Sequence, residues 1–154
     1  MNRPDSRTFK RTHRKMRHSL ERLDAFLQTH ENRPGHEDHR DMKPCRLRDR
    51  VGTLLEACVD CYELEEKGFS KERRLREVTR SARRYDALLA EHRRILIALR
   101  AISAACEVYC EEKQRPGPRL LQWIQGTVNR ALRHEDKEQA FFQGLFYQDL
   151  GGLD

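Results

Sequence analysis

The sequence predicts an all-α, up-down-up-down four-helix bundle, and three observations carry this prediction. Apolar residues recur at three- and four-residue intervals in four segments, which is the spacing of one face of an α-helix. Charged residues make up 36% of the 154 residues and hydrophobic residues 37%, a balance typical of long amphipathic helices. Only eight Gly and five Pro interrupt the chain, so an architecture of many short strands is not expected.

The first two helices are separated by a polar loop. The first is predicted over about residues 7–30, and its apolar stripe consists of Phe9, Met16, Leu20, Leu23 and Leu27. Asn32, Pro34 and Gly35 then open a loop that runs to Pro44. The second helix ends near Gly68, and its stripe consists of Leu47, Val51, Leu54, Cys58 and Cys61.

A crossover over about residues 68–79 leads to the second pair of helices. The stripe of the long third helix consists of Ala82, Tyr85, Leu88, Leu89, Ile95, Leu99, Ile102 and Cys106. The segment Gln114 to Pro118 ends it, and the fourth helix is expected from about Arg119 to Tyr147. Its stripe consists of Leu120, Ile124, Ala131, Phe141 and Leu145. Four long helices with short or moderate connections give an up-down bundle.

The length of the chain indicates a single domain over residues 1–154, with a basic N-terminal extension at 1–8 and a short tail at 148–154. No apolar run approaches the roughly 20 residues that a membrane span needs, and no apolar segment of a secretion signal follows the basic N-terminus. We therefore expect a cytoplasmic protein that does not contact membranes.

The net charge of +6 is concentrated in two blocks. The first comprises Arg3, Arg7, Lys10, Arg11, Arg14, Lys15, Arg17 and Arg22, and the second Lys71, Arg73, Arg74, Arg76, Arg80, Arg83 and Arg84. Such blocks can bind nucleic acid or an acidic protein in a salt-dependent way. Because they alternate with an apolar helical stripe, a solvated helix face is the favoured explanation.

Five cysteines in a chain without a secretion signal are expected to be reduced thiols. Cys58 and Cys61 form a CxxC pair, and Cys106 with Cys110 would supply the other half of a zinc site. Axial spacing argues against this site, because Cys106 lies about 21 Å along its helix from the level of His92. Cys45 falls near the level of Cys106 and Cys110, so one pairing at that end is open.

Polar residues interrupt the apolar stripes in a repeated pattern. His13 is followed by Met16, Leu20 and Leu23, and His92 is followed at the same offsets by Ile95, Leu99 and Ile102. The second and fourth helices share a different pattern, in which two polar groups lie four residues apart: Cys61 and Glu65 in CYELE, and His134 and Glu138 in HEDKE. Residues four apart share a helix face, so each pair can direct two donor groups to one place.

Axial levels indicate whether the four places coincide. His13 and Cys61 each lie about 25 Å from the connection between the first two helices, so their levels agree. His92 and His134 differ in level by roughly 7 Å, which fraying at Glu111 to Gln114 would absorb. The crossover between the second and third helices must run back along the bundle axis by roughly 20 Å, and its length allows this. Convergence of the four helices on one site is therefore permitted.

The chemical consequence of convergence is a metal site inside the bundle, built from inward side chains on all four helices. Imidazole and carboxylate together suit iron, zinc or manganese, and two carboxylates can bridge a pair of metals. Each residue also has a simpler interpretation. A single buried His is commonly a hydrogen-bonded core residue, and a His and Glu four apart are commonly a helix-stabilising pair.

These motifs resemble the hemerythrin-like family, in particular the bacterial hemerythrin HHE type. The similar elements are THRKM around His13, CYELEEKGF around Cys61 and Glu65, LLAEHRRIL around His92, LRHEDKEQAFF around His134 and Glu138, and the ending YQDLGGLD. The family pattern is a His in the first and third helices and His-x-x-x-Glu in the second and fourth. The resemblance implies a non-haem di-iron centre held by His13, Cys61, Glu65, His92, His134 and Glu138.

Two departures from the family pattern change what is expected. Cys61 stands where the family has His, and the residues four before and after His92 are Leu88 and Leu96, so the additional third-helix His of oxygen-carrying hemerythrins is missing. Thiolate is a softer ligand than imidazole and favours zinc, or alters the redox behaviour of an iron site. A mononuclear, altered or metal-free descendant is expected rather than a full di-iron oxygen carrier.

Two functional hypotheses follow. The first is a metal-binding bundle that binds or senses oxygen or related small oxidants and is not an enzyme. The second is a metal-free bundle that contacts nucleic acid or an acidic protein through its basic faces. Hydrolase and kinase activities are not indicated, because the sequence contains no Gly-rich phosphate loop, nucleophile elbow or HExxH helix. The identity of the metal and the oligomeric state stay open.

Overall fold

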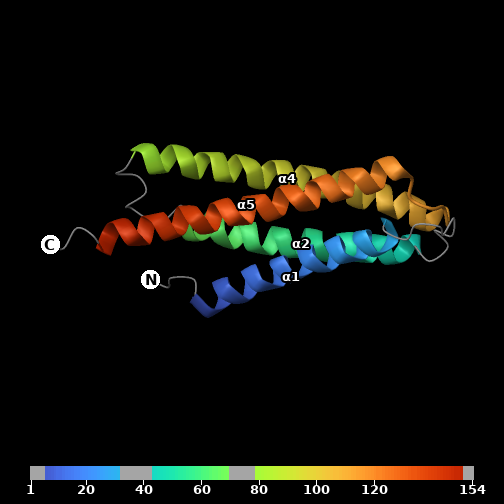
Figure 1. Ribbon diagram of the computed structural model, residues 1–154, viewed down its shortest axis with the longest axis horizontal. Helices are drawn as coiled ribbons and strands as arrows, with labels where there is room; N and C mark the ends of the chain where they lie inside the picture. The colour runs from blue at the N-terminus through green and yellow to red at the C-terminus, as the bar shows by residue number, and fades with distance from the viewer. Residues whose placement is uncertain (1–5, 32–42, 70–78, 151–154) are drawn as a thin grey trace.

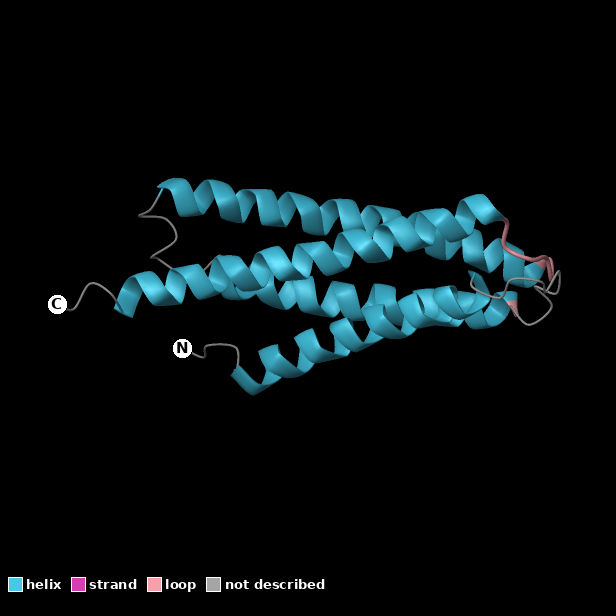
Figure 2. Ribbon diagram, viewed as in Figure 1, coloured by secondary structure: helices cyan, strands magenta, loops and turns pink. Residues whose placement is uncertain are grey.

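The computed structural model describes residues 6–31, 43–69 and 79–150, and it confirms the all-α prediction (Figures 1 and 2). Four helices account for nearly all of these residues: α1 (Ser6–Glu31), α2 (Pro44–Phe69), α4 (Thr79–Glu111) and α5 (Pro118–Leu150). The predicted extension and tail are shorter than expected, because α1 begins at Ser6 and α5 continues to Leu150. The polar loop at 32–42 and most of the crossover lie outside the described residues.

The helices lie side by side along the long axis of the molecule (Figure 1). Contacts join α1 to α2, α2 to α4, α4 to α5 and α5 back to α1, so the four helices form a closed ring around one core. Consecutive helices run in opposite directions, as the up-down prediction requires. Within the described ranges, no helix has an apolar stretch that could cross a membrane.

The core is formed where the four predicted stripes meet. Its fully buried members include Met16, Leu20, Leu23, Leu27, Leu47, Val51, Leu54, Ile95, Leu99, Ile102, Ile124, Val128 and Ala131. Burying a side chain such as Leu or Ile contributes about 1.5–3 kcal/mol. These layers therefore hold the helices at fixed rotations about their axes, and the rotation decides which polar side chains face inward.

The C-terminus of α4 is closed by a Schellman motif. Lys113 adopts a left-handed φ of 54°, the Gln114 amide donates to the Tyr109 carbonyl at 2.9 Å, and the Lys113 amide donates to the Cys110 carbonyl at 3.2 Å. The helix therefore has a defined end at Glu111. His92 lies 19 residues before it (111 − 92) and His134 lies 16 residues after Pro118 (134 − 118), a difference in level of about 4.5 Å. The connection at 112–117 takes up this offset.

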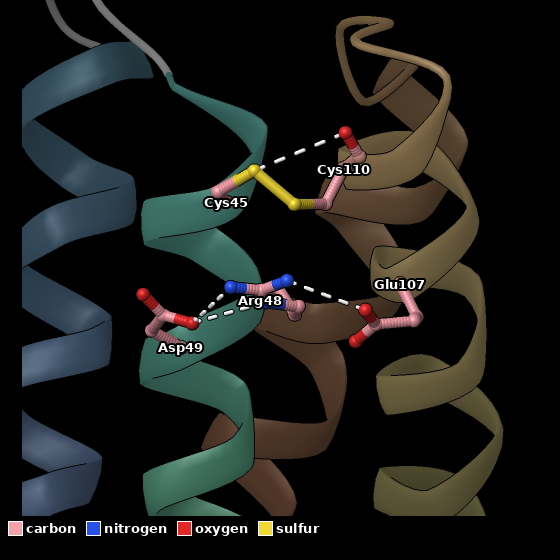
Figure 3. Close-up of a disulfide and its surroundings, with 5 residues drawn as sticks. All are labelled: Cys45, Arg48, Asp49, Glu107 and Cys110. Atoms are coloured by element: carbon pink, nitrogen blue, oxygen red, sulfur yellow. Dashed lines mark hydrogen bonds and ion pairs between the residues drawn. A yellow bond between two sulfur atoms is a disulfide. The ribbon is translucent and has the colours of Figure 1, made fainter.

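Cys45 at the start of α2 and Cys110 near the end of α4 form a disulfide with a Cα–Cα distance of 4.8 Å (Figure 3). The expectation of five reduced thiols is therefore wrong for this pair. Cys45 pairs with Cys110 and not with Cys106, because the rotation of α4 about its axis directs Cys106 into the core, where it is 1% exposed. One turn along the same seam, Arg48 bridges Asp49 and Glu107 at 2.9 and 3.3 Å (Figure 3). Cys58, Cys61 and Cys106 are free thiols, and all three are buried.

Candidate metal centre

All six residues of the predicted set meet inside the bundle. α1 supplies His13, α2 supplies Cys61 and Glu65, α4 supplies His92, and α5 supplies His134 and Glu138. Five of them are at most 2% exposed, whereas the side chain of His13 is 31% exposed. They form two groups of three, and within each group the ligand atoms lie within 4.8 Å of one another.

The first group lies between α1 and α2. His13 Nδ1 is 3.1 Å from Cys61 Sγ and 3.1 Å from Glu65 Oε1. The Cys61 thiol donates to Glu65 Oε1 at 3.3 Å. These three contacts confirm that His13 and Cys61 share one axial level, and they place imidazole, thiol and carboxylate atoms around one point.

The second group lies between α4 and α5. His92 Nε2 is 2.7 Å from Glu138 Oε1, and His134 Nε2 is 3.3 Å from the same oxygen. The His92 and His134 rings stand edge to face, with centroids 4.7 Å apart. The second group therefore offers two imidazoles and one carboxylate, without a thiol.

Glu65 joins the two groups. Its Oε1 faces His13 and Cys61, while its Oε2 lies 3.3 Å from His92 Nε2. The two oxygens of one buried carboxylate thus point to different groups, which is the arrangement that a bridging carboxylate requires. The six residues form a single continuous cluster.

Glu135 is a seventh polar residue of this cluster, and it was not among the predicted site residues. Its side chain is 3% exposed, its Oε1 lies 3.8 Å from His13 Nε2, and its Oε2 lies 3.4 Å from Arg17 Nη1. A signal for it exists in the sequence, because Glu135 continues the buried spacing of Val128 and Ala131. Glu135 directly follows His134, and adjacent residues point about 100° apart on a helix, so both were not expected to face the same site.

Tyr62 packs against the imidazoles of the second group. Its ring is buried and stacks on His92, with centroids 3.9 Å apart and planes inclined by 8°. It also meets the His134 ring edge to face at 5.9 Å. Because Tyr62 follows Cys61 in α2, this stack fixes the orientation of His92 relative to the first group. The other nitrogen of His92, Nδ1, lies 3.5 Å from Glu66 Oε1.

The electrostatics of the cluster are dominated by buried carboxylates. Burial alone would lower the pKa of His92, but its hydrogen bond with Glu138 and its close contact with the Glu65 carboxylate outweigh burial and raise this pKa to about 9. Burial would raise the pKa of Glu138, but its contacts with His134 and His92 lower it to about 2. The Glu65 contact, opposed by burial, raises the pKa of His13. Burial raises the pKa of the Glu135 carboxyl.

The thiol of Cys61 is held in its protonated form. Burial is the main cause, and the neighbouring carboxylate of Glu65 adds to it, so the pKa of Cys61 lies far above its ordinary value. Without a cation, this residue is a hydrogen-bond donor to Glu65. A metal ion that used its sulfur would have to displace the proton.

Several buried polar atoms of the cluster make no hydrogen bond within the protein. They are His92 Nδ1, both ring nitrogens of His134, Glu65 Oε2, Glu135 Oε1 and Glu138 Oε2. Glu65 Oε2 lies 3.3 Å from His92 Nε2, and His134 Nε2 lies 3.3 Å from Glu138 Oε1. Both contacts are within ion-pair distance, but neither has the geometry of a hydrogen bond. Buried polar atoms without partners are costly, and a bound metal ion would supply partners to several of these atoms.

The donor set fits a transition-metal ion. Ligand atoms bound at about 2.0–2.3 Å from one metal lie roughly 3.0–3.5 Å from one another, and most donor pairs within the two groups are separated by 3.1–3.3 Å. Three imidazoles, two carboxylates and one thiol supply nitrogen, oxygen and sulfur ligands. The residues present thus support a metal site, and they do not identify the metal.

The alternative four-thiol site does not form. Cys110 is in the disulfide, and in the part of the chain that the structure describes the two converging ligand groups include neither Cys58 nor Cys106. Burial raises the pKa of Cys58 to about 12 and that of Cys106 to about 11. Both are therefore core thiols of low reactivity at neutral pH.

No family model, curated protein sequence or solved structure matches this chain. The resemblance to the hemerythrin-like family therefore stays a prediction. What stands independently of it is a four-helix bundle with two groups of His, Cys and Glu side chains that could hold a metal ion.

Proposed function

We propose that this protein is a hemerythrin-like, non-haem metal-binding bundle whose site is altered on the side of α1 and α2. The observation that carries the proposal is the position of Glu65, whose two carboxylate oxygens lie 3.1 Å from His13 Nδ1 and 3.3 Å from His92 Nε2. His13, Cys61 and Glu65 would hold an ion on one side, and His92, His134 and Glu138 would hold one on the other.

The donor types favour iron in the second group and a softer metal ion in the first. His92, His134 and Glu138 form a two-His, one-carboxylate set, which is the ligand type of non-haem iron. Cys61 brings a sulfur ligand to the first group, which is better suited to zinc or to an iron ion with altered redox behaviour. Iron, with zinc in the first group, is therefore the expected cofactor.

The proposed role is to bind or sense dioxygen or a related small oxidant, without turnover of an organic substrate. A bound iron ion would supply the redox chemistry that this role needs. The chain supplies the access: His13 is 31% exposed, whereas the donors behind it are buried. Tyr62 and the apolar layers around His92 exclude bulk water from the second group.

The metal content of the purified protein tests the proposal. Protein expressed with iron and purified without a His tag is expected to carry close to one or two equivalents of transition metal. Less than about 0.2 equivalents of any transition metal would contradict it, since a built site with these donors binds tightly. The double variant His134→Gln/Glu138→Gln is expected to lose the metal of the second group.

A matched control comes from the same type of residue outside the cluster. His18 is exposed on α1 and is not a member of either ligand group. The variant His18→Gln should retain the full metal content. If this control lost as much metal as the double variant, binding would be a property of surface histidines.

The competing function is a metal-free bundle that contacts nucleic acid or an acidic protein. Lys10, Arg11, Arg14 and Arg22 are exposed on α1 and favour it. Other cations of the same block are already engaged, since Lys15 lies 3.7 Å from Asp60 and Arg17 lies 3.5 Å from Asp136. Salt-dependent binding to RNA or DNA by protein without metal would favour this function over the metal site.

A further inference from the structure

The outward face of α4 carries exposed apolar residues that the bundle does not use. Among the described residues, three large apolar side chains are exposed, and two of them are on this helix: Ile97 at 66% and Val108 at 50%. They are eleven residues apart, which is close to three full turns, so they lie on one face about 16 Å apart. The small residues Ala101 and Ala104 lie between them and are also exposed.

Charges flank this apolar stripe in an asymmetric way. Arg93 and Arg94 precede Ile97 by one turn, and Glu111 and Glu112 follow Val108 by one turn. All four are exposed. Arg94 has a local contact with Glu91 at 3.4 Å, and no ion pair between described residues engages Arg93, Glu111 or Glu112. One end of the stripe is thus basic and the other end acidic.

The stripe is complementary to itself when a second α4 runs in the opposite direction. Around a midpoint between Ile102 and Ser103, Ile97 of one copy is level with Val108 of the other, and Ala101 is level with Ala104. The same register brings Arg93 and Arg94 of each copy beside Glu111 and Glu112 of the other, within about one residue of axial rise. The two alanines at the centre let the helices approach closely.

We propose that the α4 face from Arg93 to Glu112 is a homodimer interface, in which α4 packs antiparallel against α4 of a second copy around a twofold axis. A twofold interface requires a surface that is complementary to itself, and both the apolar and the charged residues meet this requirement in a single register. A parallel arrangement would place the arginines of both copies together, so it is disfavoured.

The second copy accounts for the pattern better than an unrelated partner does. Any partner could cover Ile97 and Val108, but only a copy of this chain explains why the basic and acidic ends are equally distant from the midpoint. One helix face per copy is smaller than the roughly 800 Å² per partner of a standard interface, so we expect dissociation at micromolar concentrations.

Charge reversal tests the register. Wild-type protein at about 100 μM in low salt is expected to sediment as a dimer of the 18.3 kDa chain. The variants Arg93→Glu/Arg94→Glu and Glu111→Arg/Glu112→Arg place like charges together at both ends of the homodimer. Each alone is expected to raise the dissociation constant at least about tenfold. An equimolar mixture should form heterodimers with wild-type affinity, because opposite charges then meet at both ends.

A substitution in the apolar stripe, with a matched substitution on α5, tests the apolar part of the proposed interface. Ile97→Arg should also give monomers, whereas Trp123→Arg, which changes a 46% exposed residue on α5, should leave the dimer intact. Helical circular dichroism of each variant verifies the fold. A monomeric wild-type protein at 100 μM, or a mixture of the two charge variants that stays monomeric, would overturn the proposal. Metal content should be unchanged in every variant, so this result is independent of the proposed metal binding.

Discussion

A thiol at position 61 sets the chemistry of the ligand group between α1 and α2. Cys61 Sγ lies 3.1 Å from His13 Nδ1 and 3.3 Å from Glu65 Oε1, so sulfur is in the position of a ligand. Its high pKa means that a cation must displace a proton to use the sulfur. The corresponding residue of the second group is His134, and imidazole differs from a thiol because its neutral form is already a ligand.

Replacing the thiol by imidazole tests this difference between the groups. The variant Cys61→His is expected to carry severalfold more iron in the first group, because imidazole and carboxylate suit iron better than a protonated thiol does. Iron per chain, measured by mass spectrometry after expression with iron, is the readout. Cys58→Ala, which changes a buried cysteine outside both groups, is the matched control. Equal iron in Cys61→His and wild-type protein would show that Cys61 does not limit the site.

The pKa shifts of His92 and Glu138 predict how the stability of the metal-free protein responds to pH. The pKa of His92 is raised from 6.5 to about 9, so its stabilising contribution is complete below pH 6.5 and is lost as pH rises through 9. The pKa of Glu138 is lowered from 4.5 to about 2, so its contribution is complete above pH 4.5 and is lost as pH falls through 2. Stability should therefore be greatest between about pH 4.5 and 6.5.

Urea unfolding with a chelator present measures this dependence. The free energy of unfolding is expected to fall by roughly 2–3 kcal/mol between pH 6.5 and 9.5. In His92→Gln, the fall over this range should be much smaller, because the group responsible is absent. A free energy that stays constant or increases over this range in the wild-type protein would contradict the proposed His92–Glu138 ion pair.

At the scale of elements, the disulfide fixes the seam between α2 and α4 at one end of the bundle. Cys45 and Cys110 are separated by 65 residues, so the bond closes a long loop in the unfolded chain. In the chain-entropy description, a loop of this length stabilises the folded state by up to about 4 kcal/mol. The variant Cys45→Ser/Cys110→Ser should therefore have a lower melting temperature under oxidising conditions.

Reducing conditions provide the comparison for this variant. With a strong reductant, wild-type protein should melt close to the temperature of the double serine variant. The variant Cys106→Ala would also be less stable, because Cys106 is a core residue, but its melting temperature should still fall when reductant is added. If reductant had no effect on the wild-type protein, the disulfide would not contribute to stability.

Helices were easier to predict than the contacts at their ends. The spacing of apolar residues is repeated over many turns, so the four helices and their inward faces followed from it. The Schellman end at Lys113 and the choice of Cys110 over Cys106 depend instead on single residues and on the rotation of a helix about its axis. A few degrees of rotation per turn are not encoded in a three- and four-residue pattern.

At the scale of the whole molecule, the site follows from the symmetry of two similar helix pairs. Matching levels on four helices permitted six distant residues to converge, and the contacts of His13 with Cys61, of His92 with Glu138 and of Glu65 with His92 bring them together. Their role as metal ligands stays a prediction. The predicted set did not include Glu135, because a residue beside a ligand points in a different direction from it. Nor could the sequence assign the two oxygens of Glu65 to different groups.

The central claim is that this cluster is a metal centre, and anomalous diffraction from crystals of the metal-loaded protein tests it most directly. Data collected on both sides of the iron and zinc absorption edges would locate and identify each ion. We predict a peak about 2.0–2.3 Å from ligand atoms of His92, His134 and Glu138, with Glu65 turned toward it. Crystals grown with iron and zinc that show no anomalous peak in the cluster, and that keep the hydrogen bonds of His92 to Glu138 and of Cys61 to Glu65, would contradict the claim.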